Sequence, residues 1–413
     1  MHMQRSTDPQ PVRAIPAIIR RLKAPARAKA VLLALLNIKG GALAIRLPDG
    51  QTLLMGDDTA PPIDLTVRDY RFAARVLKNG DIGFAEAWMA HEWETSDLSG
   101  LLTLLASNIE RFRRVFEGSV LGKALNWWRH ISRANTRAGS ERNIHAHYDL
   151  GNRFYEAWLD PSMTYSSARF DANVADLESG QRAKYRALAE HLDLKPTDHV
   201  LEIGCGWGGF AEFAAREYGA RVTGITISDE QLAYARARME RVGLSDRVEI
   251  RKQDYRDVEG QFDKVASIEM FEAVGEEYWP AYFGKIADVL KPGGRAGLQI
   301  ITIDNALFAS YRRRADFIQR YVFPGGMLAS IERLKEETTK AGLAWRRVEA
   351  FGQSYAQTLA EWSRRFQAKW TDIRGLGFDE RFKQLWLFYL SYCEAGFRTG
   401  RTDVVQLELA KPA

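Results

Sequence analysis

The residues best placed to do chemistry lie in a glycine-rich turn within "HVLEIGCGWGGFAEFAAREYGARVTGITIS", residues 199–228. Apolar residues before the turn predict a buried strand, and those after it predict a helix. Glycines in such a turn expose backbone N–H groups and let a ligand come close, because no Cβ blocks the approach. Glu202 lies on the strand, ahead of Gly204, Gly206 and Gly208. An acid in that position suits a ligand with a cationic amino acid, so the pattern favours S-adenosylmethionine.

The same turn allows two other interpretations. Gly204, Gly206 and Gly209 satisfy the dinucleotide pattern GxGxxG. Dinucleotide binding also calls for an acid about 20 residues later, at the end of the second strand, to hold a ribose. Here that strand ends in "TGITIS", which is uncharged. Dinucleotide binding is therefore the weaker hypothesis, and a turn of purely structural use is weaker still.

Length and composition predict a globular protein of two domains. The chain has 413 residues, of which 46% are hydrophobic and 27% are charged. No apolar run approaches the ~20 residues that span a bilayer. The longest candidate, "AVLLALLNI" at residues 30–38, follows basic residues but leads into "KGG". That is no small-residue cleavage site, so we favour an ordinary element over a signal peptide.

Cysteine and histidine indicate neither a disulfide framework nor a metal centre. The two cysteines, Cys205 and Cys393, lie far apart in the sequence, as expected for a protein of a reducing cytoplasm. His145 and His147 have no third ligand nearby in the sequence, so we expect no bound metal.

Basic residues gather in three stretches. Eight Lys and Arg residues precede Gly40, against Asp8 alone, and further runs occupy residues 111–142 and 311–321. One such run is usually a solvated helix face. Three runs interleaved with apolar residues favour an anionic partner, and motifs typical of nucleic-acid binding are missing. We therefore expect a cytoplasmic protein that associates peripherally with the inner face of the membrane.

Strand and helix signals divide the chain into two domains. Residues 1–131 read as a basic α+β domain that associates with lipid or membrane; they include a hairpin at 41–55, a strand at 63–67 and helices at 68–93 and 98–116. Residues 132–143 have the composition of a linker. Residues 144–413 form the expected catalytic domain, in which strands and helices alternate from residue 195 onward. This alternation predicts a doubly wound, mostly parallel sheet, finished by late strands at 345–352 and 403–410.

Longer motifs carry a resemblance to a known family. They are "HYDLGNRFYEAWLDPSMTYSSARF", "LEIGCGWGGFAEFAA", "GITISDEQ", "QDYRD", "SIEMFEAVG", "YVFPGG" and "FGQSYAQTLAEW", in order across residues 145–398. With them the chain resembles the cyclopropane fatty acid synthases, which include the mycolic acid cyclopropane synthases and related lipid C-methyltransferases. "NGDIGFAEAWMAHEW" extends the likeness to two-domain bacterial members. The resemblance implies a class I methyltransferase fold, Rossmann-like with a seven-stranded sheet, after a smaller α+β domain; bacterial relatives are often homodimers.

The resemblance also implies how S-adenosylmethionine is held. Its amino-acid part would meet Tyr165, Ser166, Glu202, Gly204, Gly206 and Gly208; its ribose would meet Thr226, Ile227 and Gln231; its adenine would meet Asp254, Tyr255 and Ile268. The amide of Gln231 then does what an acid does in many methyltransferases, which accounts for the uncharged strand end. Taken singly, Tyr255 is equally a core aromatic, Thr226 a strand residue and Asp254 a helix cap.

The implied reaction is methyl transfer to the cis double bond of a fatty acyl chain in a membrane phospholipid. A sulfonium makes the methyl group electrophilic, and an alkene attacks it directly, so no protein nucleophile is required. The product of that step is a carbocation, which aromatic faces stabilise. Among the many aromatic residues of 345–397, we single out Tyr355 in "FGQSY".

After methyl transfer a base must remove a proton from the cation. This sequence departs from the family at the residues that would hold that base. In cyclopropane-forming relatives the base is taken to be a bicarbonate ion, held by a Cys, a Glu, a His, a Tyr and a backbone group. Glu272, Tyr355 and Ile301 match, but the Cys position is Ser167 and the His position is Gln299. Either the altered site still binds bicarbonate and the chain becomes a cyclopropane, or weaker binding leads to a methyl- or methylene-branched chain.

Two other functions stay open at this point. A methyltransferase acting on a soluble small molecule would leave the basic first domain unexplained. A non-catalytic lipid-binding protein is disfavoured because Glu202, the glycines, Gln231 and Glu272 are all present.

Overall fold

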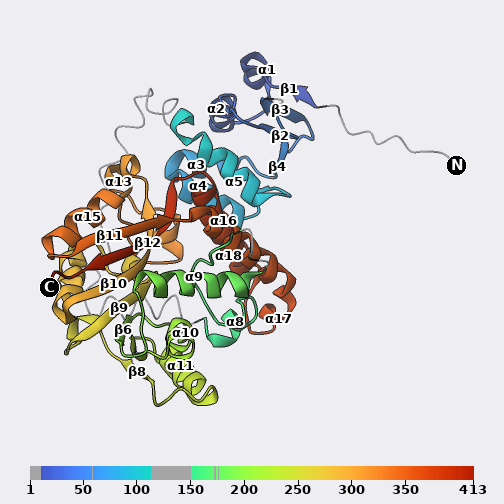
Figure 1. Cartoon of the computed structure of the whole chain (residues 1–413). Coiled ribbons are helices and arrows are strands. Elements are labelled where there is room, and N and C mark those ends of the chain that lie inside the picture. The colour runs from blue at the N-terminus through green and yellow to red at the C-terminus, as the bar shows by residue number, and fades with distance from the viewer. Residues whose placement is uncertain (1–10, 58, 113–149, 172–173, 175) are drawn as a thin grey trace. The chain divides into compact units, whose positions relative to one another are not determined.

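The computed structural model describes residues 11–57, 59–112, 150–171, 174 and 176–413 (Figure 1). They divide into two compact units. The first unit holds the described residues up to 112 and also Phe378–Thr399; the second holds the remaining ones. The expected linker at 132–143, nearly all of the basic run at 111–142, and both His145 and His147 lie outside the described residues.

The first unit contains a five-stranded sheet in the order β1-β3-β2-β4-β5. Its strands are β1 (Val12–Arg13), β2 (Ala42–Arg46), β3 (Thr52–Gly56), β4 (Ile63–Val67) and β5 (Trp93–Glu94). Antiparallel pairing of β2 with β3 confirms the hairpin predicted at 41–55, and β4 confirms the next strand.

Helices complete this first unit. They are α1 (Pro16–Arg21), α2 (Ala26–Leu35), α3 (Arg71–Asn79), α4 (Asp81–Met89), α5 (Leu98–Ser107) and α18 (Glu380–Arg398). The apolar run at 30–38 mostly forms α2, whose Leu32 and Ala34 are buried, so the prediction of an ordinary element is confirmed. Gly80, at φ +62°, separates α3 from α4. Within the described residues, every helix is too short or too polar to cross a membrane.

Helix α18 joins the first unit although it lies near the end of the sequence. It packs on α5 and α4. The indole Nε1 of Trp88 donates to Gln384 O at 3.0 Å, and Ser99 Oγ donates to Glu394 Oε2 at 2.7 Å. This arrangement differs from the predicted division, which placed all of 144–413 in one catalytic domain. The apolar face of α18 finds its partners in helices that precede it by about 300 residues.

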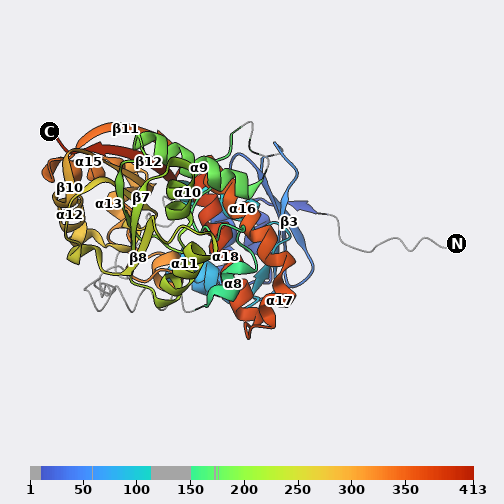
Figure 2. The same cartoon turned by 60° about the horizontal axis from the view of Figure 1, so that its bottom comes forward.

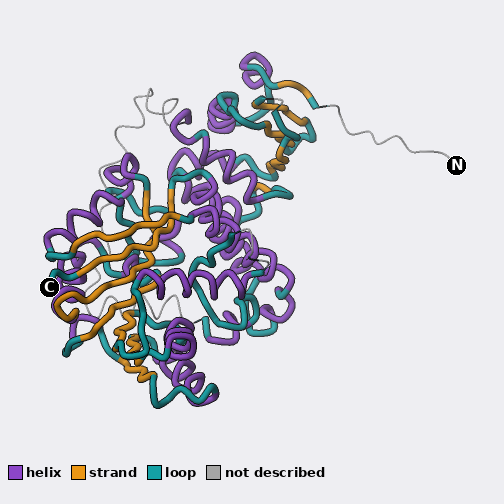
Figure 3. The backbone as a smooth tube through the Cα atoms, in the orientation of Figure 1, coloured by secondary structure: helices purple, strands orange, loops and turns teal. Residues whose placement is uncertain are grey.

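A seven-stranded sheet forms the centre of the second unit, in the order β11-β12-β10-β9-β6-β7-β8. Its strands, orange in Figure 3, are β6 (His199–Ile203), β7 (Arg221–Thr226), β8 (Val248–Lys252), β9 (Phe262–Ile268), β10 (Leu290–Ile303), β11 (Ala344–Ala350) and β12 (Thr402–Ala410). The five strands from β8 to β10 run parallel, and β12 is antiparallel to both of its neighbours. The predicted sheet and its two late strands are therefore confirmed.

Helices cover both faces of this sheet, as the turned view in Figure 2 shows. One apolar layer contains Leu188, Phe210 and Met239 of the helices α9 (Leu177–His191), α10 (Gly209–Tyr218) and α11 (Asp229–Arg241). The other layer contains residues of α12 (Trp279–Val289), α13 (Asn305–Tyr311) and α15 (Ile331–Lys340). The remaining helices are α8 (Asn152–Glu156), α14 (Phe317–Tyr321), α16 (Gly352–Ala368), α17 (Trp370–Arg374) and the short 3₁₀ turns Tyr255–Asp257, Phe271–Ala273 and Glu276–Tyr278. This is the doubly wound α/β fold that the alternating pattern predicts.

The sheet determines where the site forms. Because β6, β7 and β9 are parallel neighbours, the segments that follow them emerge at one edge of the sheet. Ligands of such sheets bind outside the carboxyl ends of the strands. The glycine turn after β6, Ile227 after β7 and Glu269 after β9 all lie at that edge.

Candidate active site

The glycine turn joins β6 to α10 with backbone angles that suit glycine. Gly204, Gly206 and Gly208 have φ values of +79°, +53° and +83°. A Cβ added to Gly204 would lie 2.6 Å from Met270 Cγ, whereas one added to Gly206 would meet no atom within 4 Å. The backbone at Gly206 therefore borders open space, which a ligand can approach closely.

Glu202 supplies a buried carboxylate beside this turn. Its side chain is 3% exposed, and its Oε2 accepts no hydrogen bond from the part of the chain that the structure describes. Burial raises the pKa of Glu202 to about 8. A buried acceptor without a donor is costly, and a cationic or hydrogen-bonding ligand would remove that cost.

Thr226, Ile227 and Gln231 lie together after β7. Thr226 Oγ1 donates to Gln231 Oε1 at 2.9 Å, and the backbone N–H of Gln231 donates to Ser228 Oγ. The amide carbonyl of Gln231 is thus used within the protein. Its NH₂ group is the part that suits a ligand hydroxyl, as predicted for a ribose.

Asp254, Tyr255 and Ile268 lie farther along the same edge. Asp254 binds Arg256 with both carboxylate oxygens, at 2.8 and 2.6 Å, and also caps the turn that begins at Tyr255. Tyr255 packs edge-on against Tyr282, and burial raises the pKa of its hydroxyl to about 12. The capping and core roles considered for these residues are thus present, and their contact with an adenine stays a prediction.

Tyr165 and Ser166 lie between an aromatic cluster and a buried lysine. The ring of Tyr165 lies 5.3 Å from that of Trp362 and 5.6 Å from that of Trp158. Ser166 Oγ accepts a hydrogen bond of 2.6 Å from Lys184 Nζ. Lys184 is completely buried, and this burial lowers its pKa to about 7. The sequence analysis did not identify Lys184.

The most closely connected group of polar residues centres on Glu269, which the sequence analysis also missed. Its Oε1 accepts from Ser167 N at 2.8 Å and from Gln299 Nε2 at 2.7 Å. Its Oε2 accepts from Tyr355 Oη at 2.5 Å. Three of the five predicted catalytic residues are therefore brought together, and they surround a carboxylate of the chain itself.

Burial and hydrogen bonding act on Glu269 in opposite directions. Burial raises its pKa, while Lys184 and the three donors lower it, and the net shift is upward. Glu269 also has a φ of +49°, in the left-handed region that disfavours a residue with a Cβ. The surrounding structure therefore holds this side chain in place against a backbone preference.

Glu272 and Ile301, the other two predicted catalytic residues, meet each other. The backbone N–H of Ile301 donates to Glu272 Oε1 at 2.5 Å. Glu272 Oε2 is buried and accepts no hydrogen bond from the described residues. Burial, and then the nearby charge of Glu269, raise the pKa of Glu272 to about 8.

Comparison with known proteins identifies the family. Residues 135–407 match the family described as mycolic acid cyclopropane synthetase. The chain belongs to this family. It is 36% identical to the tuberculostearic acid methyltransferase UfaA1 of Mycobacterium tuberculosis, over 96% of this chain and 95% of that protein. It is also 36% identical to the cyclopropane-fatty-acyl-phospholipid synthase of Escherichia coli, over 85% of this chain and 88% of that protein.

A solved structure of the same family agrees with the fold. The mycolic acid cyclopropane synthase CmaA1, complexed with SAH and CTAB, is similar with a TM-score of 0.60 and 30% identity, covering 66% of this chain and 98% of that one. The predicted resemblance and class I methyltransferase fold are confirmed. The chain is a member of the S-adenosylmethionine-dependent fatty acid methyltransferases and cyclopropane synthases.

The residues at the sheet edge fit the methyl donor of this mycolic acid cyclopropane synthetase family. Open space beside Gly206 and the unpaired Oε2 of Glu202 suit its backbone contact and its amino-acid part. When bound, S-adenosylmethionine supplies a methyl group on a positively charged sulfur. Among the described residues, we find no cluster of three or more His, Cys, Asp or Glu able to hold a metal ion.

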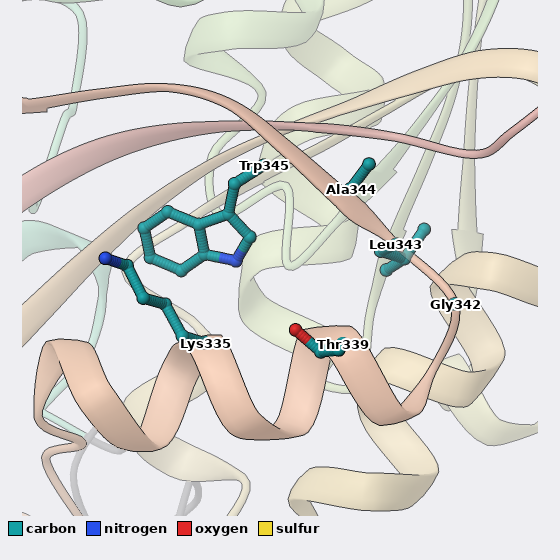
Figure 4. Close-up of a pocket in the computed structure, with 6 residues that line it drawn as sticks. All are labelled: Lys335, Thr339, Gly342, Leu343, Ala344 and Trp345. Atoms are coloured by element: carbon teal, nitrogen blue, oxygen red, sulfur yellow. The ribbon is translucent and has the colours of Figure 1, made fainter.

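A surface pocket lies elsewhere in this family member, between α15 and β11 (Figure 4). Trp345 and Lys335 border it, with the lysine Nζ 5.4 Å from the centre of the indole ring. Trp345 Nε1 donates to Thr338 Oγ1 at 2.6 Å. The pocket shares no residue with the sheet edge described above, so we assign the chemistry to that edge.

Proposed function

We propose that this protein transfers the methyl group of S-adenosylmethionine to the cis double bond of an unsaturated fatty acyl chain in a membrane phospholipid. The observation that carries the proposal is the carboxylate of Glu269, held by three donors near the aromatic ring of Tyr355. Alkene methylation needs a base but no nucleophile. The names of the relatives, a tuberculostearic acid methyltransferase and a cyclopropane-fatty-acyl-phospholipid synthase, support the same substrate class.

The aromatic cluster supports the cationic stage of this reaction. The ring of Trp362 lies 5.3 Å from that of Tyr165 and 6.1 Å from that of Tyr355. Trp362 and Tyr355 are buried. Each aromatic face that meets a desolvated cation contributes on the order of 2 kcal/mol. A buried aromatic wall next to a carboxylate therefore suits an alkyl cation that must lose a proton.

The identity of the proton that is lost determines the product. Removal of a proton from the added methyl group closes a cyclopropane ring. A hydride shift followed by loss of a proton gives a methylene-branched chain, and loss of a proton from a neighbouring chain carbon gives a methyl-branched chain that keeps a double bond. The names of the two relatives at 36% identity differ at this point, because one is a tuberculostearic acid methyltransferase and the other is a cyclopropane-fatty-acyl-phospholipid synthase.

Features of the first unit support attachment to an anionic membrane surface. Arg20, Arg21 and Lys23 are exposed, and the apolar Ile15 nearby is 50% exposed. Each cation near an anionic surface contributes about 1 kcal/mol of binding. Drawing an acyl chain directly from the membrane avoids its exposure to water, which costs ~0.8 kcal/mol per CH₂. We propose peripheral binding to the membrane by this surface, and a homodimer as the assembly to test.

The experiment uses the pure, full-length protein with methyl-deuterated S-adenosylmethionine. Vesicles of a cis-monounsaturated anionic phospholipid serve as substrate, and vesicles of the saturated analogue serve as the control. We expect label in the acyl chains of the unsaturated lipid alone, and mass spectrometry with NMR will identify ring, methylene or methyl branch. Label appearing in the headgroup, or transfer to neither lipid, would overturn the proposal.

A further inference from the structure

The donors around Glu269 belong to three of the five residues that the family resemblance assigned to a bicarbonate ion. The backbone N–H of Ser167 and the side chains of Gln299 and Tyr355 come from three different parts of the chain, and each donates a hydrogen bond to the Glu269 carboxylate. The Ser167 hydroxyl donates to Ala168 O instead. A carboxylate and a bicarbonate ion present the same pair of anionic oxygens to such donors. The position that an external ion would need is therefore taken by a side chain, and the residues present do not fit a bound bicarbonate.

We propose that Glu269 is the base of this enzyme, so that the reaction proceeds without bicarbonate. The inference rests on the proposed methyl transfer to a double bond. As the methyl carbon leaves sulfur, the alkene π pair forms the new C–C bond and leaves the neighbouring carbon cationic. Glu269 then accepts a proton, and the electron pair of the broken C–H bond forms the third ring bond or a new double bond. The carboxylic acid so formed returns its proton to solvent.

The hydrogen bonds leave Glu269 suited to that role. Its two oxygens accept hydrogen bonds from three donors. A carboxylate has about four acceptor positions, so one stays available for a proton. Lys184 contributes a nearby positive charge, which favours the ionised carboxylate. Glu272, the other acid nearby, accepts a hydrogen bond from Ile301 N at one oxygen. Its pKa is raised to about 8, so its ionised form is disfavoured. Of the two acids, Glu269 is thus the one held as an anion by several donors.

Two variants separate a base from a structural carboxylate. Glu269→Gln keeps the size of the side chain and removes the proton acceptor. Glu269→Gly removes the side chain and suits the local φ of +49°, so it should fold while opening a space for a small anion. Glu277→Gln, at an exposed glutamate of the same segment, is the matched control.

Activity is measured in buffer freed of carbon dioxide and again with added bicarbonate. For the wild type we expect the same rate in both, within twofold. Glu269→Gln should lose roughly 100-fold or more in kcat, the usual effect of removing a general base, with S-adenosylmethionine affinity within about threefold. Glu269→Gly should be equally slow without an anion and recover at least tenfold with bicarbonate or formate. The control should match the wild type.

A binding measurement gives a second readout that does not depend on turnover. Calorimetry with bicarbonate, and crystals soaked in it, should show binding to Glu269→Gly at the Ser167, Gln299 and Tyr355 donors and none to the wild type. Bicarbonate binding to the wild type, a wild-type rate that rises with bicarbonate, or a fast Glu269→Gln variant would overturn the inference. If the wild type transfers no methyl group to lipid, the proposed function fails. The binding result still decides whether Glu269 or a bicarbonate ion occupies the anion position.

Discussion

Lys184 Nζ donates a hydrogen bond of 2.6 Å to Ser166 Oγ, one residue before the backbone N–H that holds Glu269. The lysine also lies 4.6 Å from the centre of the Tyr185 ring. The acids whose charges act on it are Glu269, Asp160 and Glu202. A buried lysine thus connects the expected cofactor residues to the carboxylate that we assign as the base.

Replacing this lysine should move the pH dependence of catalysis. The positive charge of Lys184 lowers the pKa of Glu269, so Lys184→Met should raise that pKa. Catalysis requires ionised Glu269, so kcat rises with pH as this carboxyl group loses its proton. In Lys184→Met that rise in kcat, the rising limb of the pH profile, should occur at higher pH. The measurement is kcat against pH. Lys264→Met, at another buried lysine on β9 that faces Asp198, is the control and should leave the limb in place. An unmoved limb in Lys184→Met would show that the lysine has a structural role alone.

Gly206→Val should abolish binding of S-adenosylmethionine. Its side chain would occupy the open space beside the turn, and its backbone would be strained at φ +53° by about 1–2 kcal/mol. Gly243→Val is a matched control, because Gly243 has a φ of +68°, borders open space and lies outside the site. Calorimetry should show affinity at least 100-fold weaker for Gly206→Val and near normal for the control. Equal loss in both variants would trace the effect to backbone strain.

Glu272→Gln should become more stable relative to the wild type as pH rises. The pKa of Glu272 is about 8 in the folded protein, against a usual value of 4.5. The folded state then holds a proton that the unfolded state has lost, so wild-type stability falls between pH 4.5 and 8. Glutamine does not titrate, and the difference in unfolding free energy should grow by on the order of 2–4 kcal/mol over that window. Denaturant unfolding of both proteins at pH 5 and pH 8.5 measures the difference in unfolding free energy. The same difference at both pH values would contradict the assigned pKa.

Neutralising exposed cations of the first unit should weaken membrane binding. The residues to replace with serine are Arg20, Arg21, Lys23 and Arg27. At about 1 kcal/mol each, their loss should weaken the affinity for anionic vesicles, measured by sedimentation, by roughly 1,000-fold, and high salt should have the same effect on the wild type. Substitution is preferable to deleting residues 1–29, because Ile19 and Ala28 are buried core residues.

The control for that experiment removes equally many exposed cations from the second unit. They are Arg241, Arg346, Lys369 and Arg374. This variant has the same net charge and should sediment like the wild type. If both variants lose binding alike, overall charge rather than the first unit governs attachment.

The sequence predicted the sheet well because local patterns determine its strands. Apolar runs such as "HVLEI" and the turn glycines after them need no distant partner to be recognised. Ser167, Gln299 and Tyr355 were identified through family motifs, but their common partner was not. Glu269 lies 102, 30 and 86 residues from them in the chain, and only the folded sheet brings the four together.

The missed lysine and the missed domain boundary have a similar cause. Lys184 lies on α9 among residues typical of an exposed helix, and its burial depends on the sheet against which α9 packs. Helix α18 continues the sequence of the second unit, while its apolar residues pack on α4 and α5. Tertiary packing determines both the burial of Lys184 and the unit to which α18 belongs, and sequence patterns do not predict such long-range packing.

The path of the chain through α18 has a consequence for how this protein can be made and divided. The chain leaves the second unit at Phe378 and returns to it at Gly400, so the two units are joined by three crossings of the polypeptide and cannot be separated by one cut. A fragment that begins after the first unit would display Trp386, Phe388 and Leu390 to water. Such a fragment should aggregate, and the ribosome must have synthesised the chain past Thr399 before the first unit can complete its own core.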